Sequence, residues 1–196
     1  MGYEDIILAR LEEALSVKEK MLRSESLKDG INRSVEIILK SYREEKGRLF
    51  LAGNGGSAAD AQHLACELVG RFYLDRKSLS AEALTVNSSS LTAISNDFGY
   101  EKLFARALEG KGKKGDVFMG LSTSGSSLNI VNALKQAREM GMHTIGLTGE
   151  KTGLMDEWCD IVIKIPESDT PRIQEGHILA GHIICEIVER EMFPHA

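Results

Sequence analysis

The sequence predicts an α/β fold: a three-layer sandwich with a five-stranded parallel sheet flanked by helices and preceded by an N-terminal helical pair. Two observations predict it. After residue 47, five short apolar runs alternate with helical patterns, as is typical of parallel strands buried on both faces. Before that point, residues 1–46 show only helical periodicity. A length of 196 residues suits one domain over 1–196, with helices in 1–46 and the α/β core in 47–196.

The N-terminal segment carries two apolar stripes at helical spacing. The first consists of Leu8, Leu11, Leu15 and Leu22, and the second of Leu27, Ile31, Val35, Ile38 and Tyr42. The segment SESLKDG lies between them and predicts a break between two helices. An apolar stripe on a long leading helix can also face a second subunit.

The strands and helices of the core follow in chain order. We expect strands in the runs RLFLAG, AEALTV, DVFMGL, MHTIGL and DIVIKI, which begin at residues 48, 81, 116, 142 and 160. We expect helices over 58–69, 90–108 in pieces, 128–140, 153–158 and 173–190. The last helix contains Gly176 and Gly181, and interior glycines weaken a helix unless close packing requires them. Ligands of such folds bind at the carboxyl ends of the strands, so the loops there are the candidate site.

Composition excludes several classes of function. Lys and Arg number 24 against 29 Asp and Glu, and a net charge of −5 does not suit a nucleic-acid-binding face. No apolar run approaches the roughly 20 residues needed to span a bilayer, and no signal peptide is visible. The three cysteines, Cys66, Cys159 and Cys185, form no CxxC pair. We therefore expect a cytoplasmic protein with reduced thiols and no membrane or nucleic-acid partner.

The loop after the first expected strand is Gly53-Asn54-Gly55-Gly56-Ser57. Glycines allow a backbone to approach a ligand closely, and the helix that follows offers free N–H groups at its start. The spacing matches neither the dinucleotide-binding G-x-G-x-x-G pattern nor a Walker A loop. Two interpretations remain open, a ligand-binding loop and a tight strand-to-helix turn.

The loop after the third expected strand, residues 122–127, contains five hydroxyl residues at the start of a helix. One hydroxyl is enough to cap a helix. The surplus favours an anion site built from hydroxyls, backbone N–H groups and the helix dipole. A phosphate monoester is the natural anion, and the loop contains no Lys or Arg, so binding would rely on hydrogen bonds.

Two helices carry residues that suit a zinc ion. His63 and Glu67, four positions apart, share one helical face, and Gln174 and His182 lie two turns apart on the last helix. Imidazole and carboxylate are good zinc ligands, whereas a glutamine oxygen is unusual. The alternative is that these are unrelated surface and core residues. His177 lies well round the last helix from His182, and we expect it to be a packing or surface residue.

Taken together, these segments resemble the sugar isomerase domain family, and within it the phosphoheptose isomerases. The resemblance rests on GNGGS, on the loop STSGSS, on NDFG at residues 96–99 and on RIQEGH at residues 172–177. The segment DAQHLACELVGRF together with RIQE and His182 marks the isomerase branch. The resemblance covers nearly the whole chain, including its leading helices.

The resemblance implies an aldose–ketose isomerase that converts sedoheptulose 7-phosphate to D-glycero-D-manno-heptose 7-phosphate through a cis-enediol, for bacterial surface polysaccharides. It assigns zinc, one ion per subunit, to His63, Glu67, Gln174 and His182. It assigns substrate binding to Asn54, Gly55, Gly56, Glu67, Asn96, Asp97, Ser122, Thr123, Ser124, Ser127 and Gln174, with the four hydroxyl residues on the phosphate. It also implies a homotetramer with active sites shared between subunits.

Glu67 and His182 match the family's proposed proton-transfer pair, with Glu67 our candidate base and His182 our candidate acid. A zinc-bound carboxylate is a weaker base, so either the metal changes ligands during turnover or it acts as a Lewis acid while one residue moves protons. Two other functions are alternatives. The first is a phosphosugar-binding regulator or a replication-initiator-associating adaptor of the same fold, and the presence of Glu67 and His182 argues against it. The second is an isomerase for another phosphosugar, which stays open because hydroxyl-rich loops do not report the length of the sugar.

Overall fold

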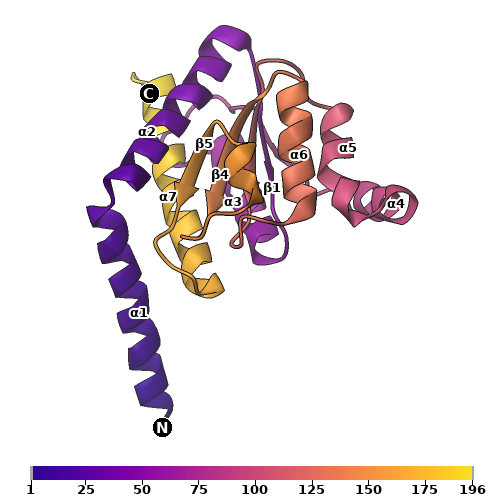
Figure 1. Cartoon of the computed structure of the whole chain (residues 1–196). Helices are drawn as coiled ribbons and strands as arrows, with labels where there is room; N and C mark the ends of the chain where they lie inside the picture. The colour runs from indigo at the N-terminus through magenta and orange to yellow at the C-terminus, as the bar shows by residue number, and fades with distance from the viewer. Residues whose placement is uncertain (1, 196) are drawn as a thin grey trace.

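The five apolar runs form one parallel sheet in the computed structural model, which describes residues 2–195 (Figure 1). The strands are β1 (Leu49–Ala52), β2 (Ala81–Ala83), β3 (Val117–Leu121), β4 (His143–Thr148) and β5 (Ile161–Lys164). Their order across the sheet is β2–β1–β3–β4–β5. The direction of winding changes between β1 and β3, which are neighbours. This switch point places the loops that follow β1 and β3 side by side at the carboxyl edge.

Helices cover both faces of the sheet and complete the expected three layers. One face packs against α2 (Glu25–Lys40), α3 (Gly56–Val69) and α7 (Thr170–Met192), and the other against α5 (Leu103–Glu109) and α6 (Leu128–Glu139). Each face has its own buried cluster because the strands alternate their side chains between the two layers. In β1, for example, Leu51 joins the first cluster and Phe50 the second.

The two leading helices behave differently. In α2 the apolar stripe is buried as expected, with Ile38 fully inaccessible. In α1 (Tyr3–Arg23) only Val17 and Met21 are buried, and the expected stripe is exposed, with Leu15 at 59%. Figure 1 shows α1 projecting from the body of the molecule. The break between the helices is also shorter than SESLKDG, because Ser24 alone ends α1 and caps α2 with its hydroxyl.

Close packing explains both glycines inside α7. A Cβ at Gly181 would lie 2.5 Å from the Leu64 side chain of α3, and one at Gly176 would lie 2.6 Å from Ile165. Both distances are too short for real contacts. Glycine therefore lets α7 approach α3 and the end of β5 closely, and this contact sets the spacing of the two helices that carry the candidate metal ligands.

Two expected elements differ from the structure. The second strand is shorter than AEALTV and ends at Ala83. The segment 153–158 forms only a 3-10 turn, η3 (Leu154–Glu157), in which Asp156 caps the N–H of Gly153. The expected division of residues 90–108 into pieces is confirmed, with α4 (Ser88–Phe98), η2 (Tyr100–Lys102) and α5. Among the described residues, no helix is both long and apolar enough to cross a membrane.

Candidate active site

The centre of the site is a cluster of His63 and Glu67 from α3 and His182 from α7. The Nε2 atoms of His63 and His182 lie 2.9 Å apart, and Nε2 of His63 lies 3.3 Å from Oε1 of Glu67. One candidate ligand atom of each residue lies within 4.8 Å of the other two. The interpretation of these three as unrelated polar residues is therefore wrong. The arrangement suits a small divalent ion, because each side chain offers one nitrogen or oxygen to a common point.

The electrostatics of the cluster favour a neutral imidazole at His182. Burial lowers the pKa of His182, the neighbouring His63 lowers it further, and Glu67 partly opposes both effects. A neutral imidazole keeps the lone pair that a metal ion needs. One turn before His63, burial raises the pKa of Asp60, and its Oδ2 atom is buried without a hydrogen-bond partner among residues 2–195. The sequence analysis missed Asp60, although it stands at i−3 from His63.

Gln174, the fourth expected ligand, lies at the other end of α3. A Cβ at Gly56 would meet its amide nitrogen at 2.6 Å, so glycine at this position makes room for the Gln174 side chain. Eight residues separate Gln174 from His182, a rise of about 12 Å along α7. The structure thus brings three of the four expected ligands into one cluster and places Gln174 beside the glycine loop, residues 53–57.

A reciprocal amide pair orients the glycine loop. Asn54 donates to Oδ1 of Asn129 at 2.9 Å, Asn129 donates back at 2.8 Å, and the Tyr100 hydroxyl donates to Oδ1 of Asn54 at 2.7 Å. Asn129 is buried at the start of α6. Gly55 has a φ of +55°, which favours glycine. Sequence reasoning missed Asn129 and Tyr100, and the only signal was a polar residue beside the apolar stripe of α6.

The hydroxyl loop, residues 122–127, gathers its side chains as expected. The Ser122 hydroxyl lies 2.9 Å from that of Ser127 and 3.4 Å from that of Ser124. Ser127 is the N-cap residue of α6 but makes no side-chain capping bond. The surplus of hydroxyls is therefore not explained by helix capping. Together with the start of α6, these hydroxyls form a set of hydrogen-bond donors that suits an anion.

Two cavities open at the carboxyl edge of the sheet, beside the glycine loop and the hydroxyl loop. One, of about 330 Å³, is lined by the glycine loop and by Gln62, Ser95 and Tyr100. The other, of about 200 Å³, is lined by Thr123, Ser124 and the first turn of α7.

Asn96 and Asp97 do not line the first cavity. Both are exposed on α4, and Asn96 donates to Asp97 at 2.8 Å. Their neighbour Ser95 faces the cavity instead, because successive helical residues point in directions about 100° apart.

Comparisons with known proteins identify the family of the chain. A family model described as the SIS domain matches residues 12–149. The chain is 53% identical over 188 residues to phosphoheptose isomerase 2 of Campylobacter jejuni, covering 95% of this chain and 92% of that protein. It is 48% identical over 190 residues to the phosphoheptose isomerase of Clostridium acetobutylicum, covering 97% and 96%. The chain belongs to the phosphoheptose isomerase family of SIS-domain proteins.

Solved structures of phosphoheptose isomerases share the fold. The Neisseria gonorrhoeae structure matches with a TM-score of 0.89 at 36% identity, over 96% of this chain and 99% of that one. The Francisella tularensis structure matches with a TM-score of 0.92 at 30% identity, over 97% and 100%. Membership of the phosphoheptose isomerase family makes the chain an enzyme of the isomerase class and accounts for the extent of the match, which includes the leading helices.

Proposed function

We propose that this chain interconverts sedoheptulose 7-phosphate and D-glycero-D-manno-heptose 7-phosphate, in the synthesis of heptose for bacterial surface polysaccharides. One observation carries the proposal: a carboxylate and two imidazoles meet in one cluster between α3 and α7, and a loop of hydroxyls stands at the start of α6. The first group has the chemistry for moving protons, and the second has the chemistry for holding a phosphate.

The phosphate end of the substrate binds at the hydroxyl loop in this proposal. Ser122, Thr123, Ser124 and Ser127 provide the side-chain donors. The positive end of the α6 dipole adds to the attraction without a cationic side chain. The sugar hydroxyls then face the glycine loop, where the Asn129 amide holds Asn54 in one orientation.

Proton transfer takes place at the three-residue cluster. The isomerisation removes a proton from C1 of the ketose, passes through a cis-enediol and returns a proton to C2. Glu67 takes and returns the carbon-bound proton, and His182 moves a proton between the O1 and O2 oxygens. The Glu67 side chain is about one-fifth exposed, so substrate can reach it. The base and the acid come from different helices and so approach the substrate from different directions.

Zinc is the proposed cofactor, one ion per subunit. His63, Glu67 and His182 of one chain would hold it. Gln174, the candidate fourth ligand, lies about 12 Å along α7 from His182, so it would complete the site only from another subunit of the proposed assembly. The fit rests on the closeness of the three ligand atoms and on the lowered pKa of His182. When bound, zinc supplies Lewis-acid stabilisation of the negative charge that develops on the substrate oxygens.

The proposed assembly is a homotetramer in the cytoplasm. The exposed stripe of α1 supports an oligomer, and so does an apolar groove of about 430 Å³ between α1, α2 and α7, which includes Leu22 and Ile183. Contiguous exposed apolar surface of this kind marks interfaces. All three cysteines are free, as suits a reducing compartment.

Asn96 and Asp97 are exposed in one chain, and we propose that they contribute to a substrate site shared between subunits.

A direct test measures turnover of sedoheptulose 7-phosphate by the purified protein, with and without added zinc. The proposal expects formation of an aldose 7-phosphate that depends on zinc. Sedoheptulose without its phosphate serves as the control and should turn over poorly. Binding of the phosphosugar with no turnover in the presence of zinc would favour a regulatory protein, and turnover of a different phosphosugar in its place would identify a different isomerase.

A further inference from the structure

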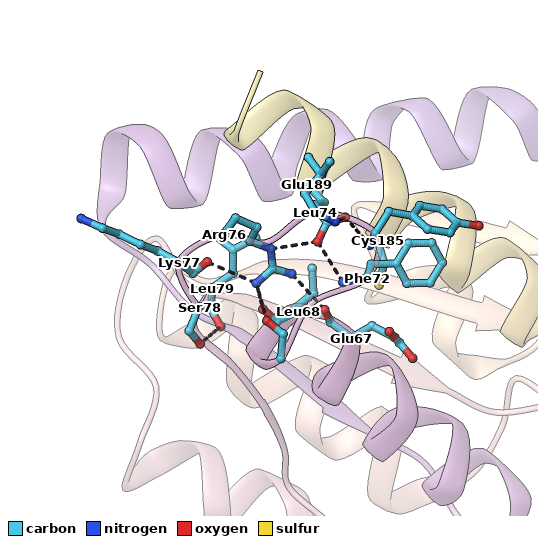
Figure 2. A network of polar contacts seen from close by, with 12 residues as sticks. Glu67, Leu68, Phe72, Leu74, Arg76, Lys77, Ser78, Leu79, Cys185 and Glu189 are labelled. Atoms are coloured by element: carbon cyan, nitrogen blue, oxygen red, sulfur yellow. Dashed lines mark hydrogen bonds and ion pairs between the residues drawn. The ribbon is translucent and has the colours of Figure 1, made fainter. Parts of the chain in front are cut away.

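A buried ion pair joins the loop after α3 to α7, close to the three-residue cluster. Nε of Arg76 lies 2.9 Å from Oε1 of Glu189, and the two side chains are 0% and 1% exposed. The Glu189 carboxylate also accepts hydrogen bonds from three consecutive backbone N–H groups, those of Phe72, Tyr73 and Leu74, at 2.7–3.0 Å. Figure 2 shows this network, in which one carboxylate of α7 holds the loop that follows α3.

Arg76 makes the complementary connections. Its guanidinium donates to four backbone carbonyls, those of Glu67, Leu68, Gly70 and Lys77. The last carbonyls of a helix have no partner within the helix. Arg76 supplies partners for two carbonyls in the final turn of α3, including that of Glu67 at 2.9 Å. In Figure 2 the Glu67 side chain points away from the guanidinium, while its carbonyl faces it.

Stability alone does not account for this network. Burying two charges removes their hydration, and a well-packed apolar pair is often at least as stable. Removing only one partner is costly, since the other charge then stays buried and unpaired. Burial raises the pKa of Glu189, but the three backbone N–H groups and Arg76 outweigh it and leave the pKa below its ordinary value. Glu189 is therefore ionised at neutral pH.

The position of the network relates it to the active site. His182 and Glu189 lie seven residues apart, which places them on the same face of α7. Glu67 lies in the last turn of α3. In addition, Phe72, whose N–H is held by Glu189, places its ring 5.6 Å from the His182 ring, measured between centroids. The network thus contacts both helices of the cluster and the aromatic neighbour of His182.

We propose that Arg76 and Glu189 are positioning residues for the reaction, which fix the end of α3 against α7 and so keep Glu67 and His182 at their working distance. The inference rests on the proposed function, since the reaction and its metal ion are what this geometry serves. Neither residue touches the substrate. Both act through the backbone of α3 and the ring of Phe72.

The test compares Glu189→Gln and Arg76→Lys with a matched control, Asp116→Asn. Asp116 is a fully buried carboxylate that also accepts backbone N–H bonds, from Arg48 and Lys113, but these partners precede β1 and β3 and belong to neither α3 nor α7. Each variant is measured for zinc affinity by competition with a chromogenic chelator, for kcat and KM, and for melting temperature. Arg76→Lys keeps the charge but has no planar fork for several carbonyls.

We expect Glu189→Gln and Arg76→Lys to lower zinc affinity and kcat by about tenfold or more, the size of effect seen for residues that orient metal ligands. KM should stay near its original value, because the hydroxyl loop is untouched. Asp116→Asn should lower the melting temperature to a similar degree while zinc affinity and kcat stay unchanged. If the two network variants have a lower melting temperature but unchanged zinc affinity and kcat, as the control does, the positioning role is wrong.

Failure of the proposed function gives a different pattern. A protein that binds zinc but does not isomerise sedoheptulose 7-phosphate contradicts the function, and the zinc affinities still decide the positioning role. A protein that isomerises without zinc contradicts the metal assignment, and the kcat values of the variants then decide the positioning role. Zinc affinity is measured well below each melting temperature, so partial unfolding of a variant does not affect the comparison.

Discussion

His63 and His182 are 119 positions apart in the sequence, yet their Nε2 atoms lie 2.9 Å from each other. The contact exists because α7 returns to the sheet beside α3, and Gly181 allows the two helices to approach closely against Leu64. Glu67 completes the group from the next turn of α3. The reaction that we propose depends on this convergence more than on any one residue.

Replacing the Glu67 carboxylate is the most direct test of the proton-transfer role. Glu67→Gln removes both the candidate base and an anionic ligand with little change of shape. Proton transfer by a positioned residue contributes about 100-fold or more, so we expect kcat to fall at least that far. Affinity for inorganic phosphate, measured by calorimetry, should stay nearly unchanged because the hydroxyl loop is intact.

Glu186→Gln is the matched control for that variant. Glu186 lies on α7 and pairs with Arg190 at the surface, so its replacement should leave kcat near that of the unaltered protein. His182→Ala should be as severe as Glu67→Gln. Near-normal turnover in Glu67→Gln would show that Glu67 is not the base.

The fold and the pairing of His63 with Glu67 follow from local patterns in the sequence, whereas the resemblance to the family was needed to bring His182 to the same site. Short apolar runs predict buried parallel strands, and the i, i+4 spacing of His63 and Glu67 places both on one helical face. The roles of Arg76, Asn129 and Asp60 do not follow from such patterns. Arg76 and Asn129 act through partners on other elements of the fold, and Asp60 stands out only because its carboxylate is buried. Neither a distant partner nor burial of a polar group produces a periodic pattern in the sequence. The exposure of α1 was also unpredictable, because an apolar stripe looks the same whether it faces the core or another subunit.

Ser124→Ala tests the hydroxyl loop. A hydrogen bond to a charged group contributes roughly 1.5–3 kcal/mol, so loss of one should raise KM about tenfold to a hundredfold. Chemistry in the bound state should change less, because Ser124 does not belong to the proton-transfer cluster. Steady-state kinetics, with inorganic phosphate as a competitive inhibitor, measure both effects. Ser126→Ala is the control, since the Ser126 hydroxyl accepts a bond from the Leu154 N–H. If saturating phosphate leaves the rate unchanged, the phosphate binds elsewhere.

Leu15→Glu tests the role of the exposed stripe on α1. Leu15 is 59% exposed in the single chain, so a charge there should hardly affect the fold of one subunit. In a subunit interface the same charge would be buried without a partner, and the assembly should dissociate. Sedimentation velocity at micromolar concentration measures the change. Glu12→Gln, on the same helix and also exposed, should leave the assembly intact. A stable and active monomer of the unaltered protein contradicts the proposed tetramer.

The burial of His177 predicts that the folded protein loses stability at acid pH. Burial lowers the pKa of the His177 imidazole to about 4 from its ordinary value of 6.5. A histidine with a lowered pKa in the folded state contributes stability that is present above pH 6.5 and is lost as the pH falls towards 4. The shift corresponds to up to about 3 kcal/mol. Urea unfolding at pH 7 and pH 4.5 should show this loss, and His177→Leu should reduce it. His177→Leu should keep most of its kcat, since His177 lies outside the cluster. An unchanged pH slope in His177→Leu would contradict this account.

The last prediction concerns zinc and separates the ligands by strength. Removing metal with a chelator should abolish isomerisation, and zinc should restore it. His63→Ala and His182→Ala should each lower zinc affinity strongly, because imidazole is a good zinc ligand. Gln174→Ala should lower it less, because a neutral amide oxygen is a weaker donor and the Gln174 side chain lies beside Gly56.

Gln136→Ala is the control for Gln174→Ala. Gln136 lies on α6 in a surface groove with Phe98 and Arg106, on the other face of the sheet from α3 and α7. Chelator competition on each variant, without substrate, gives the affinities independently of turnover. Full zinc affinity in Gln174→Ala would leave three protein ligands and an open position for a water molecule or a substrate oxygen, which is the pattern of a catalytic zinc site. A moderate loss would instead place Gln174 among the ligands, and the substrate would then have to displace its amide or enlarge the coordination shell. The loss of zinc affinity in Gln174→Ala therefore decides how the metal can reach the substrate.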